Sequence, residues 1–567
     1  MGERTTYADR PWLKSYTFGP WKLAQTLEPY PKVPLFKILD DAAVKYSSRV
    51  AILFQGREIR FLELKQLADK LATALADLGV KKGDRVAAIL PNLPQFIISD
   101  FAVLKVGAVF VPIAFTIKAP ELEYELITSG AETVICSEES LDLVNSLKLK
   151  IKIKNIIVTS SEDYTLKPPE IGGIPGAYQF RRLIAEHEAN PPEVEIDPME
   201  DLAYLNFTGG ATGVPKGVML THFNRMTNIL QAVPWMLTPL KLGVEGKVSI
   251  QVCIPLSHSY GYWASETAVY WGMRNILAPD PRDTDTIVGL MKEHRPYLIC
   301  CVPTQYMRLV EKKVGRMQSM LLSGTAPLPR VLSDALLAEV GMPVSEAYGL
   351  TETSPLTHMN LIAFSKITGF APALKPGSLG VPLPDTDCKL VNPETGEEVP
   401  FGEVGEVLVR GPQLMKGYWP TPGNGLENGW LRTGDIGRME EDGYFYLEDR
   451  IKDMVNISGL KVYTVVVDDA LFKHPAVAVA CAIGIPDPKV PGSERVKAFI
   501  KLKEGYEGKV TVEDIIEHCK RELEPVAVPR FVEFRDDLPL TMTEKIFKRA
   551  LREEEIKKMK EQGLLKE

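Results

Sequence analysis

Helix-like and strand-like hydrophobic patterns alternate along the first part of the chain. Residues 61–78 carry apolar side chains at helical spacing, whereas residues 85–90 and 108–112 are short apolar runs typical of buried strands. Helices that alternate with buried strands form βα units, in which the strands pair in parallel. The pattern therefore predicts an α/β fold with largely parallel sheets, and no internal repeat of fixed period accompanies it.

The longest apolar stretch, residues 97–117, is interrupted by residues that a membrane span avoids. Asp100 and Lys105 place charges inside the stretch, and Gly107 and Pro112 divide it. We therefore expect a buried helix followed by a buried strand, and no transmembrane segment.

The length of the chain indicates more than one domain, because 567 residues are too many for a single hydrophobic core. A polar stretch with Pro and Gly, residues 160–198, predicts a long surface excursion. The expected domain break comes later, after a strand predicted at residues 443–447, and leaves a segment of ordinary domain size. We predict domains at residues 1–449 and 450–567.

Composition and charge restrict the class of protein. With 45% hydrophobic and 25% charged residues, the chain has the composition of a soluble globular protein. Its net charge of −8 gives no basic excess for binding nucleic acid. The seven cysteines form no CxxC pair, the N-terminus lacks the apolar core of a signal peptide, and neither end carries a lipidation motif. We expect a cytoplasmic protein.

Residues 205–218 (LNFTGGATGVPKGV) carry the most informative motif. Glycines permit positive φ and close approach of backbone amides to an anion, while Thr208, Thr212 and Lys216 add side-chain donors and a positive charge. The loop therefore predicts phosphate binding. It differs from the P-loop of kinases and ATPases, because Pro215 precedes the lysine and Gly217 follows it.

Six further segments accompany this loop in a fixed order. They are residues 255–261 (PLSHSYG), 323–328 (SGTAPL), 346–353 (EAYGLTET), 429–435 (GWLRTGD), 452–462 (KDMVNISGLKV) and 538–546 (LPLTMTEKI). Together the segments resemble the motifs of the AMP-forming, acyl-activating (ANL) superfamily of acyl-CoA synthetases, luciferases and peptide-synthetase adenylation domains. The resemblance spans nearly the whole chain, and within the superfamily the chain resembles the long-chain fatty acid–CoA ligases.

The resemblance implies both a fold and a set of ligands. The implied fold has a large N-terminal domain of βα-built sheets with a β-barrel-like subdomain, and a small, mobile α+β C-terminal domain with a hinge near Lys452. The implied ligands are ATP, Mg²⁺, coenzyme A and a carboxylic acid, so the expected partners are small molecules. A homodimer and a transient contact with a membrane surface stay open.

The resemblance also implies roles for single residues. Lys545, His258, Thr208 and Lys216 are the implied catalytic residues, and Glu352 is implied to hold Mg²⁺, which prefers carboxylate and phosphate oxygens. The residues implied to bind nucleotide or coenzyme A are Gly209, Gly210, Ala211, Thr212, Gly213, Ser323, Gly324, Thr325, Ala326, Glu346, Ala347, Tyr348, Gly349, Thr351, Asp435, Arg450, Ser458, Gly459 and Lys461.

Three of these roles are specific. By resemblance, Tyr348 stacks near adenine, Asp435 accepts hydrogen bonds from the ribose hydroxyls beside Arg450, and Lys545 bridges the substrate carboxylate and the α-phosphate. The segment around Lys461 is implied to face the active site during thioester formation.

The chain also departs from the family pattern. Ala211 stands where threonine is common, Glu544 replaces the usual glycine before Lys545, and residues 463–468 lack the usual proline and first glutamate. None of these changes removes a charged group that adenylation needs.

The chemistry explains why such residues belong together. A carboxylate is a poor acceptor for a thiol, so it first attacks the α-phosphate of ATP and expels pyrophosphate, after which AMP is the leaving group. Positioning and charge stabilisation dominate such a reaction. The overall resemblance implies a fatty acid–CoA ligase. It includes the Phe-Thr-Gly-Gly start of the phosphate loop and apolar residues near the implied acyl tunnel, namely Tyr260, Tyr262, Trp263 and Val302.

Four alternatives stay open at this point. The nearest is an aryl-acid CoA ligase of the coumarate type, followed by a luciferase-like oxygenase, for which no motif specifies the chemistry. A non-catalytic protein that binds nucleotide or coenzyme A is disfavoured by the joint presence of Glu352, Asp435, Arg450 and Lys545. A P-loop enzyme is disfavoured by the order of the phosphate loop.

Overall fold

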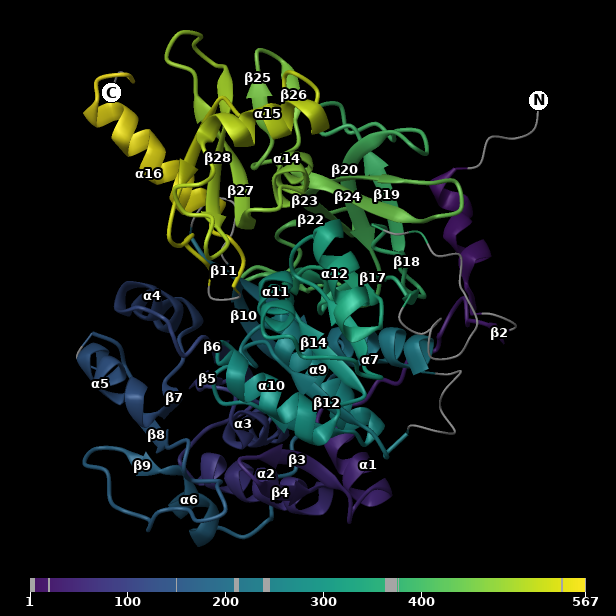
Figure 1. The fold of residues 1–567 in the computed structure, drawn as a ribbon. Coiled ribbons are helices and arrows are strands. Elements are labelled where there is room, and N and C mark those ends of the chain that lie inside the picture. Colours follow the sequence, from purple (N-terminus) through teal and green to yellow (C-terminus); the bar gives the residue numbers. More distant parts are fainter. Residues whose placement is uncertain are drawn as a thin grey trace.

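A computed structural model of the protein describes residues 6–18, 21–148, 150–208, 214–237, 245–362, 375, 377–541 and 544–565. Figure 1 shows a large body formed by the N-terminal and central parts of the chain, with the C-terminal strands and the helix α16 (Lys548–Glu561) packed at one end of it.

The first sheet is built mainly from parallel strands. Its described strands are, in spatial order, β21 (Gly417–Tyr418), β11 (Lys216–Thr221), β10 (Leu202–Thr208), β6 (Val109–Ile113), β5 (Arg85–Ile89), β7 (Thr133–Ser137), β8 (Asn155–Thr159) and β9 (Tyr178–Gln179). The strands from β10 to β9 are parallel, and β11 and β21 extend the sheet antiparallel. The strands predicted at residues 85–90 and 108–112 are β5 and β6, so both predictions are confirmed.

A second sheet repeats this design. Its described strands are, in spatial order, β18 (Val381–Pro382), β17 (Leu356–Met359), β16 (Val344–Gly349), β15 (Met320–Ser323), β14 (Leu298–Cys301), β12 (Ser249–Val252), β13 (Arg274–Leu277), β3 (Val50–Phe54) and β4 (Arg57–Arg60). The strands from β16 to β3 are parallel, which confirms the prediction of largely parallel sheets.

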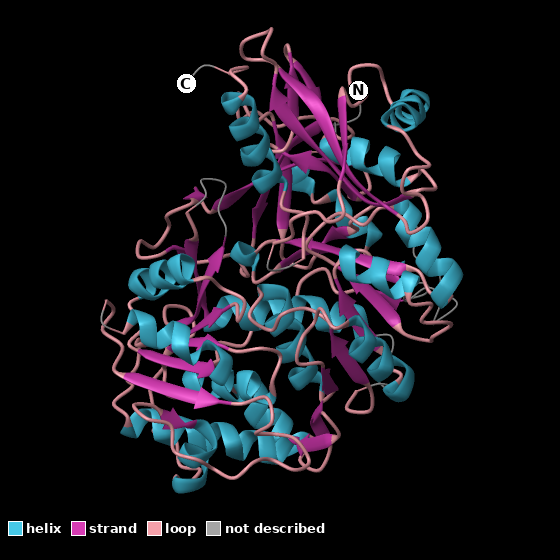
Figure 2. Cartoon of the chain, turned by 60° about the vertical axis from the view of Figure 1, so that its left-hand side comes forward, coloured by secondary structure: helices cyan, strands magenta, loops and turns pink. Residues whose placement is uncertain are grey.

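Helices cover both faces of both sheets (Figures 1 and 2). One hydrophobic core lies between the sheets, and two others lie on their outer faces. The inner helices are α1 (Lys37–Lys45), α2 (Phe61–Asp77), α3 (Pro94–Lys105), α7 (His222–Leu237) and α9 (Ser259–Trp271). The outer helices are α4 (Ala119–Ser129) and α5 (Glu138–Leu147) on the first sheet, and α10 (Thr284–His294), α11 (Pro303–Glu311) and α12 (Arg330–Val340) on the second.

Helix α3 confirms the prediction for residues 97–117. Every side chain of α3 is buried, and the buried strand β6 follows it. Lys105 is tolerated there because its ammonium lies 2.5 Å from Asp40 and 2.7 Å from Asp69. No described helix has both the length and the apolar character of a membrane span.

Buried charged groups join the two sheets. The Tyr204 hydroxyl on β10 lies 2.5 Å from Asp100 on α3 and 2.8 Å from Glu266 on α9, and Glu266 also pairs with Arg225 on α7. One hydroxyl hydrogen serves only one acceptor, and burial beside Glu266 raises the pKa of Asp100. The protonated, neutral form of Asp100 is therefore favoured, which limits the charge buried in the apolar core.

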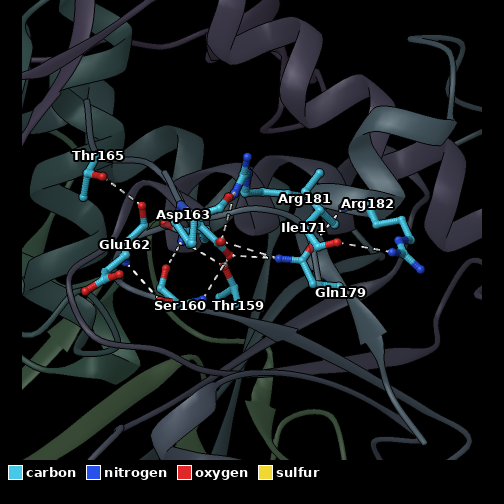
Figure 3. A network of polar contacts seen from close by, with 11 residues as sticks. Thr159, Ser160, Glu162, Asp163, Thr165, Ile171, Gln179, Arg181 and Arg182 are labelled. Carbon is cyan, nitrogen blue, oxygen red and sulfur yellow. Dashed lines mark hydrogen bonds and ion pairs between the residues drawn. The ribbon is translucent and has the colours of Figure 1, made fainter. Parts of the chain in front are cut away.

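Residues 160–198 are less superficial than the sequence suggested. They contain β9 and the helix α6 (Phe180–Glu186), whose Phe180 and Leu183 are buried. Figure 3 shows Asp163 at the centre of a polar network, where its carboxylate accepts hydrogen bonds from Thr159 and from the backbone amide of Ser160, at 2.7 and 3.0 Å. Most of the segment is exposed, so the prediction of a surface excursion holds for it, while the buried Asp163, Phe180 and Leu183 attach it to β8 and to the core.

The central chain continues into a five-stranded antiparallel sheet, where the barrel-like subdomain was expected. Its strands are β19 (Asp387–Val391), β20 (Val404–Arg410), β22 (Leu426–Glu427), β23 (Trp430–Met439) and β24 (Phe445–Arg450). The strand predicted at residues 443–447 is the start of β24.

The C-terminal part is α+β, as expected. Its strands are β25 (Val455–Ile457), β26 (Leu460–Val462), β27 (Val477–Pro486), β28 (Glu494–Leu502) and β29 (Phe531–Phe534). One hydrophobic cluster packs α14 (Thr464–Phe472) and α15 (Val512–Glu522) on the β27–β28–β29 sheet, and a second packs α16 on it.

Candidate active site

The strands that flank the phosphate loop form an antiparallel hairpin. Thr208 ends β10 and Lys216 begins β11, and the two residues face each other as partners in the ladder. The hairpin thus brings the hydroxyl and the ammonium to the same end of the sheet. Five predicted loop residues lie outside the described residues, namely Gly209, Gly210, Ala211, Thr212 and Gly213.

Tyr418 connects the phosphate loop with the predicted metal ligand. The Lys216 ammonium lies 4.7 Å from the centre of the Tyr418 ring, and the Tyr418 hydroxyl donates a 2.8 Å hydrogen bond to Glu352 Oε1. Tyr418 lies in none of the predicted motifs, and its only signal in the sequence is the Gly417-Tyr418 pair before Trp419-Pro420.

The surroundings of Glu352 fit a magnesium ion only if a bound nucleotide supplies most of the oxygen atoms that coordinate it. Glu352 lies on a short 3₁₀ turn (Thr351–Thr353), half-buried, with one carboxylate oxygen held by Tyr418. Among the described residues, no group of three His, Cys, Asp or Glu side chains could hold a metal. A triphosphate supplies such oxygens, and Mg²⁺ commonly binds through one carboxylate, phosphates and water.

His258 caps a buried helix beside the predicted acyl tunnel. It is the N-cap of α9, and its Nδ1 accepts a 3.3 Å hydrogen bond from the Tyr260 amide. Burial, reinforced by the nearby Lys545 charge, lowers the pKa of His258 to about 3, so the ring is neutral at neutral pH. The spacing of the motif has a steric reason, since a Cβ on Gly261 would lie 2.1 Å from the carbonyl oxygen of Pro255.

The predicted adenine-side residues lie on neighbouring strands. Ser323 ends β15 and is the ladder partner of Glu346 on β16, and burial raises the pKa of Glu346 to about 8. Gly324 packs against the Tyr260 ring, and Ala326 follows Thr325, which has a left-handed φ of 77°. The buried hydroxyls of Ser323 and Thr325 have no hydrogen-bond partner among the described residues, as expected of groups that await a polar ligand.

Strand β16 continues through Ala347 and Tyr348 to the predicted ribose residues. The Tyr348 hydroxyl donates a 2.8 Å hydrogen bond to Asp435 Oδ2, and Arg450 Nε lies 2.9 Å from Asp435 Oδ1. Asp435 is only 2% exposed, so its charge depends on these partners.

The turn after β16 is equally constrained. A Cβ on Gly349 would lie 1.8 Å from the carbonyl oxygen of Pro355, so only glycine fits there. The Thr351 hydroxyl lies 3.2 Å from the hydroxyl of Ser259, which begins α9. The turn therefore fixes Thr351 and Glu352 next to the His258 end of α9.

Lys545, from the far end of the chain, lies among these residues. Burial and the neighbouring Arg450 lower the pKa of Lys545 to about 7, while Asp435 opposes the shift. Lys545 also lies within electrostatic reach of His258 and Lys452. Lys545 therefore lies together with His258 and the predicted ribose residues Asp435 and Arg450. About 290 positions separate His258 from Lys545 in the sequence.

The structure does not bring the predicted coenzyme A segment to this place. Ser458 and Gly459 form the turn of the β25–β26 hairpin, and Lys461 pairs at 3.4 Å with Glu394 on an exposed turn after β19. In this conformation Lys545 lies at the candidate site, whereas the predicted coenzyme A residues Ser458, Gly459 and Lys461 lie elsewhere.

Comparison with known proteins agrees with these motifs. A family model described as AMP-binding enzyme matches residues 39–419, and one described as AMP-binding enzyme C-terminal domain matches residues 466–545.

Individual relatives match over nearly their whole length. A long-chain-fatty-acid–CoA ligase of Bacillus subtilis (strain 168) is 36% identical, with 97% of this chain and 98% of that protein aligned. A long-chain-fatty-acid–CoA ligase of Escherichia coli O6:H1 is 32% identical, with 96% and 98% aligned. The crystal structure of an anthranilate CoA ligase in complex with anthranoyl-AMP superposes with a TM-score of 0.83 at 26% identity, covering 94% of this chain and 99% of that one.

Proposed function

The chain belongs to the AMP-binding enzyme family, and on that premise we propose that it is an ATP-dependent long-chain fatty acid–CoA ligase. The observation that carries the proposal is the position of Lys545 beside Asp435, Arg450 and His258. A cation from near the end of the chain reaches a proposed nucleotide site formed by β23 and β24 of the five-stranded sheet and by the His258 end of α9. The names of the Bacillus and Escherichia relatives support the acyl substrate.

In the first step the carboxylate of the acid attacks the α-phosphate of ATP. We assign Asp435 and Arg450 to the ribose, and Thr208 and Lys216 to the phosphates. Lys545 holds the carboxylate against the α-phosphate and stabilises the charge that develops there. His258 is neutral, so it orients the reactants as a hydrogen-bonding group rather than as a cation. A magnesium ion at Glu352 neutralises phosphate charge when bound.

In the second step the thiol of coenzyme A displaces AMP from the acyl-adenylate. We propose that the C-terminal domain, residues 450–567, then turns about a hinge near Lys452. This motion withdraws Lys545 and presents Ser458, Gly459 and Lys461 to the same cleft. The separate positions of Lys545 and Lys461 support two successive arrangements of one domain.

The lining of the proposed acyl tunnel favours an aliphatic chain. Tyr260, Tyr262, Trp263 and Val302 are all buried, and Tyr260 lies against Gly324 of the proposed adenine loop. Each methylene buried on binding contributes about 0.8 kcal/mol, so affinity rises with chain length until the tunnel ends. An aryl acid is the second candidate, because the superposed anthranilate CoA ligase binds an aromatic acyl-adenylate. We further propose a cytoplasmic location.

The nucleotide product tests the reaction class. We expect AMP and pyrophosphate, formed only when acid, ATP and Mg²⁺ are all present. ADP as the product would point to a P-loop type of chemistry, and absence of turnover would point to a binding protein. Either result would overturn the proposal.

A panel of acids tests the substrate. Saturated acids of medium to long chain should outperform acetate and cinnamates in kcat/KM. A clear preference for a cinnamate would make the aryl-acid ligase the better assignment, and a preference for acetate would exclude the long tunnel.

A further inference from the structure

Glu544, the residue that replaces the usual glycine before Lys545, has an unusual backbone. Its φ is 57°, in the left-handed region that glycine adopts without strain. A glutamate in this conformation costs conformational free energy, so its side chain must bring compensating contacts.

The contacts of Glu544 lie on the other side of the domain boundary. Its Oε1 accepts a 2.7 Å hydrogen bond from Arg308, and its backbone oxygen accepts a 2.9 Å hydrogen bond from the Thr304 hydroxyl. Thr304 and Arg308 are one turn apart on α11, which packs on the second sheet. Glu544 therefore attaches the loop that carries Lys545 to a rigid helix of the large domain.

Burial makes this attachment strong. Glu544 is only 5% exposed, and its Oε2 is buried without a hydrogen-bond partner among the described residues. Arg282 lies within electrostatic reach of the same carboxylate. Two cations thus face one buried anion, and loss of the Arg308 contact would remove its direct partner and leave only the electrostatic contribution of Arg282.

We propose that Glu544 is a positioning residue that latches the Lys545 loop onto α11 for adenylation and must release it before thioester formation. The inference rests on the proposed function, since it assigns Glu544 to the first of the two half-reactions. A family loop with glycine at this position lacks the side chain for such a latch.

Half-reaction kinetics test the latch. Glu544→Gln keeps the size of the side chain but removes its charge, and Glu544→Gly also relieves the left-handed backbone. Each should slow acyl-adenylate formation about tenfold, the effect of losing one charged hydrogen bond. Transfer of prepared acyl-adenylate to coenzyme A should stay within about twofold or become faster, because that step needs the latch open.

A double-mutant cycle isolates the contact. Arg308→Gln should match Glu544→Gln, and the double variant should be no slower than either single variant. Glu553→Gln removes an exposed ion pair with Arg549 inside α16 and serves as the control that changes neither half-reaction. Unchanged adenylation in both Glu544 variants, or an equal loss in both half-reactions, would overturn the latch.

A second readout separates the latch from the proposed function. Limited proteolysis of the segment around residues 451–454 should be faster in Glu544→Gln than in the unmodified protein, because the C-terminal domain is then held less firmly. If the unmodified protein forms no AMP, the proposed function fails, while proteolysis still decides whether the latch exists. Equal proteolysis rates in both proteins would count against the latch.

Discussion

Arg450 and Asp435 are joined twice, as ladder partners between β24 and β23 and by a 2.9 Å ion pair between Nε and Oδ1. The backbone pairing fixes the side-chain pairing, so the geometry needs no ligand to form. Because Arg450 is also the last residue of β24, the proposed ribose site lies directly before the proposed hinge. The proposed nucleotide site and the proposed hinge therefore share one strand end.

The first prediction concerns Asp435. Asp435→Asn keeps the volume but removes the charge that would accept hydrogen bonds from the ribose. We expect the KM for ATP to rise about tenfold to a hundredfold, the range for a hydrogen bond to a charged group. Asp285→Asn is the matched control, because Asp285 forms an exposed ion pair with Lys312 far from the predicted residues in sequence. An unchanged KM in Asp435→Asn would refute the ribose assignment.

The second prediction is a pH dependence set by Lys545. Its pKa of about 7 lies below the value of about 10.4 for a free lysine, chiefly because of burial. Between these two values the unfolded chain binds more protons than the folded one, so this site makes the free energy of unfolding rise with pH there. The ammonium form of Lys545, which we propose acts in adenylation, is lost as the pH rises. We expect kcat/KM for adenylation to fall as pH rises through about 7.

Lys545→Arg tests this origin of the pH profile. Arginine stays protonated over the whole pH range of the assay. The fall in adenylation rate with rising pH should therefore disappear, even if the rate itself is lower. Pyrophosphate release without coenzyme A, measured from pH 6 to pH 9, reports the half-reaction. If the adenylation rate of Lys545→Arg still falls with rising pH, another group causes the fall.

The sequence predicted the parts of the fold that depend on local pattern. Strands β5 and β6 and the buried helix α3 follow from hydrophobic runs, because burial on both faces requires continuous apolar residues. For residues 160–198, the polar composition with Pro and Gly predicted the exposed path of the chain but not the buried Phe180 and Asp163 that attach it.

The motifs supplied the candidate site residues but not the contacts between them. Tyr418 contacts both Lys216 and Glu352, yet no spacing in the sequence connects three residues so far apart. Glu544 was visible only as a departure from a family pattern. Its partner Arg308 lies on a helix that no motif includes, so tertiary packing alone reveals the contact.

The third prediction concerns Tyr418. Tyr418→Phe removes the hydroxyl that donates to Glu352 while keeping the ring below Lys216. The Mg²⁺ concentration for half-maximal pyrophosphate release should rise about tenfold, because the carboxylate loses one charged hydrogen bond. Tyr506→Phe, at an exposed tyrosine of the C-terminal part, is the control. An identical Mg²⁺ dependence in both variants would exclude a role for Tyr418 at the metal.

The fourth prediction contrasts two glycines. Gly349→Ala would place a Cβ at 1.8 Å from the Pro355 carbonyl, so the turn that carries Glu352 must move. We expect a loss of about 2 kcal/mol or more in the free energy of unfolding, together with weak ATP binding. Gly289→Ala, inside α10 with open space around it, should instead stabilise by about 0.5–1 kcal/mol. Chemical denaturation of both variants checks the contrast, and equal effects would contradict it.

The last prediction concerns the proposed hinge. Lys452 lies in a turn that is fixed at one end, where the Ile451 amide donates a 3.0 Å hydrogen bond to Gly434, and closed by the bond from the Met454 amide to Arg450. Lys452→Pro would lock φ near about −65° and restrict Ile451 as well, which obstructs the rotation between the two half-reactions. Adenylation should continue at a rate within a few-fold of normal, while overall thioester formation falls by about tenfold or more. Lys452→Ala removes the same charge but leaves φ free, so it should retain both half-reactions. Equal loss of both steps in Lys452→Pro, or no loss in either, would move the hinge to another residue.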